Sequence, residues 1–351
     1  MRKSIFLSVL ALAAVVSCQK SEIVDSKFNE TIGFESYLGR DAQTKGAIIE
    51  KNDLSAVKVY GYYTGNGTWS DGTNGTAATT PNLWTEGLTL NVSNGVAVQP
   101  SGNDVRYWAN ATDKYTFLAY APIDNVNLIA PAGTNPTLTY TVTSDFQKHV
   151  DVLRAEPIIN QSKNDLSGNV SLVFKHTLAR VTVKAKVDKA TPFDFHIKSI
   201  QLSGDFPTKG TLPLAGGEWT ITETTEDAVF DFYQNAAKAN EAGAVALTTA
   251  GIDYATVVPE GAPANSNYMM MLPTTSSATL KVVYTTYSAG LESREYEKTF
   301  EITSGFAAGN AYAFILNFYQ EEGNEISFSV DVTPWDESEP SYDVNDKPVQ
   351  E

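Results

Sequence analysis

The chain has 351 residues and carries 41 acidic against 25 basic residues, a formal net charge of −16. A surface this acidic repels nucleic-acid phosphates and anionic lipid headgroups, so we expect no nucleic-acid partner. The length exceeds what one small hydrophobic core usually organises, which favours two domains. Alternating apolar segments rich in Tyr, Phe, Thr and Val far outnumber helical patterns, which indicates an all-β chain.

Residues 1–17 have the three parts of a secretory signal. Two basic residues precede an apolar block at 5–16, which is shorter than the roughly 20 residues that a membrane-spanning helix needs. The following Val15-Val16-Ser17-Cys18 resembles the lipobox of bacterial lipoproteins, whose cysteine is acylated with fatty chains such as palmitate. We therefore predict a signal peptide at 1–17 and lipidation at Cys18. The alternative is an ordinary signal with an incidental cysteine.

Cys18 is the only cysteine in the chain, so its lipidation would leave no thiol for an intrachain disulfide. Acyl chains contribute about 0.8 kcal/mol per buried CH₂, and several chains on one residue make a durable anchor. No other apolar run reaches membrane-spanning length. We therefore expect the membrane to hold this protein through lipid alone.

Residues 18–45 are predicted to form a tether, a short first strand and an exposed linker. The strand has alternating character, with Ile32 and Phe34 on one face. The stretch 37–46 that follows has turn residues, no apolar face and two basic residues, Arg40 and Lys45, after which a trypsin-type protease cuts. Exposed linkers of this kind are where proteolysis concentrates.

The other strand-like segments divide into two groups at a polar stretch around 160–169. We therefore predict an N-terminal β-sandwich at 46–166 and a C-terminal β-sandwich with an extended tail at 167–351. In the first group, 115–121 is apolar on both faces and is expected to be a central strand. A helix is allowed only at 230–247, where alanines cluster.

Alternation is clearest in the second group of strands. In 181–187 four apolar residues alternate with polar ones, as in a half-buried strand. A change of phase near Ser199 predicts a bulge or bend. The last strand, 326–332, places four apolar side chains on one face: Ile326, Phe328, Val330 and Val332.

No residue pattern indicates catalysis or cofactor binding. The histidines His149, His176 and His196 lie in or beside strand patterns without a partner at metal-ligand spacing. His196 is predicted to alternate outward between two apolar neighbours. The sequence has no nucleophile elbow, phosphate-binding glycine loop or zinc-binding His-Glu-x-x-His. We therefore expect no enzyme activity, no metal and no cofactor.

The five tryptophans are the remaining candidates for a binding site. If Trp69 and Trp84 are exposed on loops, they can stack on sugar rings; if they are buried, they anchor the core or its loops. Burial is the commoner situation. If the two tryptophans are exposed, the chain has an alternative function. It would then be a surface lipoprotein that binds glycans through these loops and does not polymerise.

A set of short motifs is spread in order over nearly the whole mature chain. After the lipobox come 115–122, 151–153, 172–180, 268–273, 309–312, 326–330 and Trp335. Together these motifs resemble the fimbrillin-like pilus subunits of Bacteroidales, which build type V pili. The resemblance implies two tandem transthyretin-like β-sandwich domains. It also implies a lipoprotein precursor that is exported to the cell outer membrane, exposed at the surface and built into a fimbrium.

The resemblance further implies assembly by strand exchange. An arginine-specific protease would cut after Arg40 and remove the covering strand with Ile32 and Phe34. An extended segment of a neighbouring subunit, of the same or a related kind, would then fill the open groove. The donor is expected in the tail 337–351 or in the last strand, at Ile326, Phe328, Val330 and Val332.

The sequence thus predicts a structural or adhesive fimbrial subunit, with other fimbrial subunits as its partners. Host or bacterial surface ligands are possible further partners. The stalk, tip and anchor roles all remain open at this point.

Overall fold

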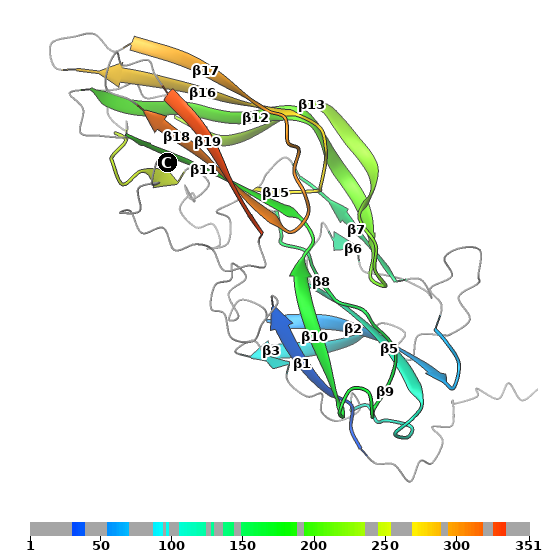
Figure 1. The fold of residues 1–351 in the computed structure, drawn as a ribbon. Coiled ribbons are helices and arrows are strands. Elements are labelled where there is room, and N and C mark those ends of the chain that lie inside the picture. Colours follow the sequence, from blue (N-terminus) through cyan, green and yellow to red (C-terminus); the bar gives the residue numbers. More distant parts are fainter. Residues whose placement is uncertain are drawn as a thin grey trace, which may run out of the picture.

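The computed structural model describes residues 30–38, 55–69, 87–93, 96–97, 105–123, 128–129, 136–143, 149–187, 193–235, 245–253, 269–288, 294–318 and 326–334. Every regular element in these ranges is a β-strand (Figure 1), which confirms the all-β expectation. Among the described residues there is no helix long and apolar enough to cross a membrane.

The strands follow one another in two groups along the described chain. The first group is β1 (Gly33–Leu38), β2 (Ala56–Gly65), β3 (Leu88–Ser93), β4 (Val96–Ala97), β5 (Lys114–Ala121), β6 (Leu128–Ile129), β7 (Thr137–Thr141), β8 (Leu153–Ala155), β9 (Ile158–Ser162) and β10 (Asn169–His176). The second is β11 (Ala179–Val187), β12 (Asp194–Pro213), β13 (Thr220–Gln234), β14 (Ile252–Asp253), β15 (Met269–Met271), β16 (Ala278–Tyr287), β17 (Arg294–Ile302), β18 (Asn310–Phe318) and β19 (Ile326–Pro334).

The first sheet has the order β1-β10-β8-β5-β2-β3-β4, and β9 also pairs with β5. Its pairs are antiparallel except β1–β10, which is parallel. Residues 115–121 of β5 are all buried. Phe117 belongs to the apolar cluster formed by one face of this sheet. Leu118 and Tyr120 belong to a separate apolar cluster, which also contains buried residues of the other two sheets. The expectation that 115–121 is central and buried on both faces is therefore confirmed.

The second group, joined by β6 and β7 of the first, forms two sheets. Their orders are β14-β11-β18-β19 and β17-β16-β12-β7-β6, where β15 adds to β11 and β13 adds to β12. Both lie in the upper lobe of Figure 1, and the first sheet lies in the lower lobe. Side chains from the two sheets meet in one core, where the rings of Phe195 and Phe318 lie 5.2 Å apart. The alternation of 181–187 matches this packing, because Val181 and Val183 are buried and Thr182 between them is half-buried.

The sheets do not follow the order of the chain where the lobes meet. After β5 the chain forms the β6–β7 hairpin in the upper lobe, where β7 pairs with residues 209–213 of β12. It then returns for β8, β9 and β10 of the first sheet. The predicted boundary at residue 166 falls between β9 and β10, two strands of the same sheet.

Two local expectations have different outcomes. A register shift between Ile197 and Ser199 on β12 lies at the bulge predicted near Ser199. The helix allowed from residue 230 is wrong for 230–234, which is the end of β13. Phe230 and Phe232 alternate into the core there, and this burial decides the conformation.

Candidate functional site

β1 and the residues just before it are held by backbone hydrogen bonds on two sides. On one side, β1 pairs in parallel with β10, with Gly33 opposite Asn169. On the other, the Ile32 N–H donates to the Arg106 carbonyl at 2.7 Å, and the Trp108 N–H donates to the Glu30 carbonyl at 3.0 Å. The segment 30–38 therefore joins two edges of the lower lobe.

Ile32 and Phe34 place two large side chains of this segment in the core. They are 2% and 1% exposed. The Phe34 ring meets the Phe117 ring edge-on at 5.8 Å, and the Trp108 ring lies 6.0 Å from Phe117 on another side. Loss of the segment would expose this aromatic pocket together with Leu172 of β10, which belongs to the same cluster.

Two polar side-chain contacts secure the segment near the start of β10. Glu30 forms an ion pair with Lys163, in the turn between β9 and β10. Asn169 Nδ2 donates to Glu35 Oε1 at 3.1 Å. Two carboxylates of the segment therefore meet two side chains of the sheet that receives it.

The energy that holds this segment is moderate. Burying Ile32 and Phe34 contributes on the order of 1.5–3 kcal/mol each, and an exposed ion pair adds about 0.2–1 kcal/mol. Covalent connection to the rest of the chain keeps the segment at a high effective concentration beside its groove. A cut in the following linker would remove that advantage without altering any contact.

The last strand, β19, lies at an edge of an upper-lobe sheet (Figure 1). It pairs antiparallel with β18 over its whole length, with Phe318 opposite Ile326 and Tyr312 opposite Val332. Phe328 stands opposite Leu316 in this ladder. Of its apolar side chains, Val330 is half-buried and Val332 is 48% exposed.

Several predicted site residues lie outside the described part of the chain. These are Cys18 with the signal at 1–17, Arg40 with its linker, and the tail 337–351. The lipidation and cleavage predictions therefore rest on the sequence.

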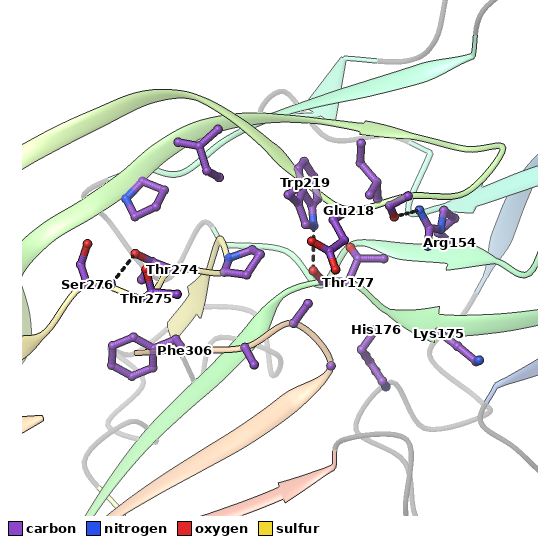
Figure 2. Close-up of a pocket in the computed structure, with 18 of the residues that line it drawn as sticks. Arg154, Lys175, His176, Thr177, Glu218, Trp219, Thr274, Thr275, Ser276 and Phe306 are labelled. Atoms are coloured by element: carbon purple, nitrogen blue, oxygen red, sulfur yellow. Dashed lines mark hydrogen bonds between the residues drawn. The ribbon is translucent and has the colours of Figure 1, made fainter. Parts of the chain in front are cut away.

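A cavity of about 1110 Å³ lies where the two lobes meet (Figure 2). Arg154 of β8 donates from Nη1 to the carbonyls of Pro213 at 3.1 Å and Gly217 at 2.8 Å. The Trp219 indole donates to the Thr177 carbonyl at 2.7 Å. Arg154 lies on the first sheet and Thr177 directly follows its strand β10, whereas their partners lie at the end of β12 and in the β12–β13 turn. These bonds therefore hold the two lobes together.

The histidines are engaged in packing. His149 Nδ1 accepts from the Met270 N–H at 3.1 Å, so its Nε2 is the nitrogen that donates, at 2.7 Å, to the Thr143 carbonyl. His176 Nδ1 lies 2.8 Å from an Asp151 oxygen. His196 is only 6% exposed, so its predicted outward exposure is wrong. A backbone bridge to Ala246 covers it, and burial lowers its pKa.

The tryptophans that are described serve as core anchors. Trp69 is 7% exposed, and its ring lies 5.3 Å from that of Tyr62. Trp108 is fully buried. Trp84 lies outside the described residues, as does Trp335. The glycan-binding alternative therefore loses Trp69 as a stacking platform.

Sequence reasoning missed Lys163, Asn169 and Arg154. None of them belongs to a motif, and the role of each depends on a partner between 59 and 134 positions away in the chain. The described residues include no group of three or more acidic, histidine or cysteine side chains placed to hold a metal ion.

Comparisons with known proteins agree with this architecture. The family model described as fimbrillin-like matches residues 44–335, a region that starts beyond β1 and Arg40. A curated relative, fimbrium subunit Fim1C of Phocaeicola vulgatus, is 25% identical over 219 residues, which span 56% of this chain and 55% of that relative. The alignment thus spans about half the length of the relative.

A crystal structure of a fimbrial protein from Bacteroides vulgatus is similar in fold. The match has a TM-score of 0.59 at 17% identity, and it covers 88% of this chain and 100% of that one. Because the fimbrillin-like model covers well over half of the sequence, the chain belongs to the fimbrillin-like family.

Proposed function

We propose that the protein is a structural or adhesive fimbrial subunit that assembles by exchange of its first strand. It is exported as a lipoprotein anchored through Cys18 at the cell outer membrane. A protease cuts after Arg40, the segment 30–38 leaves, and a strand of a neighbouring subunit takes its place. The two lobes, as tandem transthyretin-like sandwiches, remain in the fimbrium.

The position of β1 carries this proposal. It is a short parallel strand at a sheet edge. Together with Ile32 just before it, its Phe34 fills part of the apolar core of the first sheet. An edge without its strand exposes backbone donors and acceptors as well as apolar pockets, which is a template for another chain. The strand therefore delays assembly until it is removed.

The last strand supports the donor part of the proposal. The order Ile32-Gly33-Phe34 in the covering segment has a counterpart in Ile326-Ser327-Phe328 of β19. An incoming strand needs large apolar side chains at alternate positions, because only these reach the pockets. Val330 and Val332 extend the same face, and donation would exchange the β18 pairing for pairing with a neighbour.

The Arg40→Ala variant tests the function. We expect the variant to stay lipidated and monomeric on cells, because the covering segment remains tethered. The variant Lys45→Ala, which removes the other basic residue of the linker, serves as the matched control and is expected to assemble. Detergent-resistant, high-mass polymers of the Arg40→Ala protein in surface fractions would refute cleavage-driven assembly at this residue.

A further inference from the structure

The groove that holds the covering segment has two polar groups at the end where β10 begins. Lys163 lies in the β9–β10 turn and contacts Glu30, and Asn169 begins β10 and binds Glu35. Both groups belong to the receiving sheet, so they stay in place when the segment leaves. Any strand that enters the groove must therefore meet both Lys163 and Asn169 as it passes the start of β10.

The two contacts differ in strength and in what they recognise. The Lys163 side chain is 21% exposed and that of Glu30 is 55% exposed, so a carboxylate at this point gains a partly shielded ion pair. Asn169 offers an amide N–H, which donates to any acceptor oxygen but binds a carboxylate more strongly. Charges at the rim of an interface act mainly on association rate and partner choice.

The spacing of these contacts defines a sequence requirement. Glu30 lies two residues before the first buried side chain, Ile32, and Glu35 directly follows the second, Phe34. A strand that reproduces every contact has a carboxylate, one residue, a large apolar residue, one residue, a second apolar residue and a second carboxylate. The apolar pair provides affinity, and the carboxylates distinguish one donor from another.

The last strand of this chain meets only half of this requirement. With Ile326 and Phe328 aligned on the buried pair, Asn324 and Ser329 stand at the two carboxylate positions. We propose that Lys163 and Asn169 are specificity residues that favour a donor with carboxylates at these positions over a second copy of this chain. The fitting partner is a related fimbrial subunit with an acidic donor strand, so this inference rests on the strand exchange proposed above.

Peptide exchange into the cut chain tests the selection. The full chain carries a site-specific protease sequence at Arg40, is cut there, and is offered a fluorescent peptide that copies residues 28–38. A second peptide carries Glu30→Lys. A third copies residues 322–332, and a fourth adds Asn324→Glu and Ser329→Glu to it. Fluorescence anisotropy gives the association rate and the affinity of each peptide.

The 28–38 peptide should bind about two- to fivefold more tightly than its Glu30→Lys form, as an exposed ion pair implies. In a Lys163→Glu chain the order of these two peptides should reverse. A Lys209→Glu chain is the matched control, because Lys209 pairs with Glu223 in the upper lobe, and it should keep the original order. The acidic form of the 322–332 peptide should bind more tightly than the natural form.

Equal binding of all four peptides to the cut chain would overturn the selection and leave strand exchange intact. An unchanged order in the Lys163→Glu chain would do the same. If no peptide enters the cut chain, the groove does not open, and both the selection and the proposed function fail.

Discussion

Phe34 is the side chain that we expect to contribute most to the retention of β1. Its ring is 1% exposed and packs edge-on against Phe117. Replacing a buried Phe by Ala usually costs about 3–5 kcal/mol. Here the truncated strand can detach instead of leaving a cavity, because it lies at a sheet edge.

The variant Phe34→Ala should therefore open the groove in the uncut chain. Hydrogen exchange of the β10 amides that face β1 should become at least about tenfold faster, because loss of more than 1.4 kcal/mol shifts the opening equilibrium that far. Thr31→Ala, at the exposed position directly before Ile32, is the control and should leave exchange unchanged. Equal protection of β10 in wild type and Phe34→Ala would show that this ring does not retain the strand.

Sequence periodicity predicted some residues correctly at this scale and failed for others. Ile32 and Phe34 are buried as a pair, as their spacing indicates. His196 has the outward phase on β12, but its exposure depends on residues 245–248, which cross it from elsewhere in the chain. Alternation within a strand predicts the face of the sheet to which a side chain points. It does not predict whether another segment of the chain covers that face.

The turn before β18 illustrates the same dependence on distant backbone at the scale of an element. Gly305 has φ of +64°, and a Cβ there would lie 2.4 Å from the Thr274 carbonyl oxygen. Thr274 and Phe306 exchange backbone hydrogen bonds of 2.9 and 2.7 Å across this point. A side chain at Gly305 would therefore push apart the two segments that these bonds join.

Gly305→Ala should lower the free energy of unfolding by about 2–4 kcal/mol, from backbone strain and the clash together. Gly216 is the matched control, since it also has positive φ, +120°, but its Cβ would meet nothing within 4 Å. Gly216→Ala should cost only the strain, about 1–2 kcal/mol. Chemical denaturation of the two variants measures the difference, and equal losses would contradict the steric explanation.

Strand identity could be predicted from the sequence better than strand partnership. The alternation of 181–187 and the bulge near Ser199 are local properties and appear in the structure. The alanines after residue 235 suggested a helix, yet the preceding Phe230 and Phe232 fit a strand whose partner is β12. The pairing of β7 with β12 and the parallel direction of β1 depend on contacts between distant segments, which periodicity does not contain.

For the whole molecule, the link between the lobes matters as much as the strands within them. Arg154 reaches from the first sheet to two carbonyls near the β12–β13 turn, and Trp219 bonds back to Thr177 (Figure 2). A fibre transmits load through each subunit, so fixed lobes suit a structural role. The all-β class could be predicted from the sequence, and so could the family, from its motifs. This junction could not be predicted, because the partners of Arg154 lie about 60 positions away in the chain.

The central claim is that the covering strand must leave before the subunit assembles. A disulfide that joins β1 to β10 tests this claim without changing the cleavage site. Glu35 and Ser171 are direct partners in the β1–β10 ladder, and neighbouring strands are about 4.8 Å apart, within the range that a disulfide spans. The variant Glu35→Cys, Ser171→Cys can therefore be locked by oxidation and released by reduction.

The measurement is the amount of polymer formed by this variant after cleavage at Arg40, with and without reductant, beside a Glu35→Cys control. The account predicts monomer while the lock is oxidised, with the cut fragment still attached, and polymer at the level of the control after reduction. Polymer formation by the oxidised, locked protein at the level of the control would contradict it.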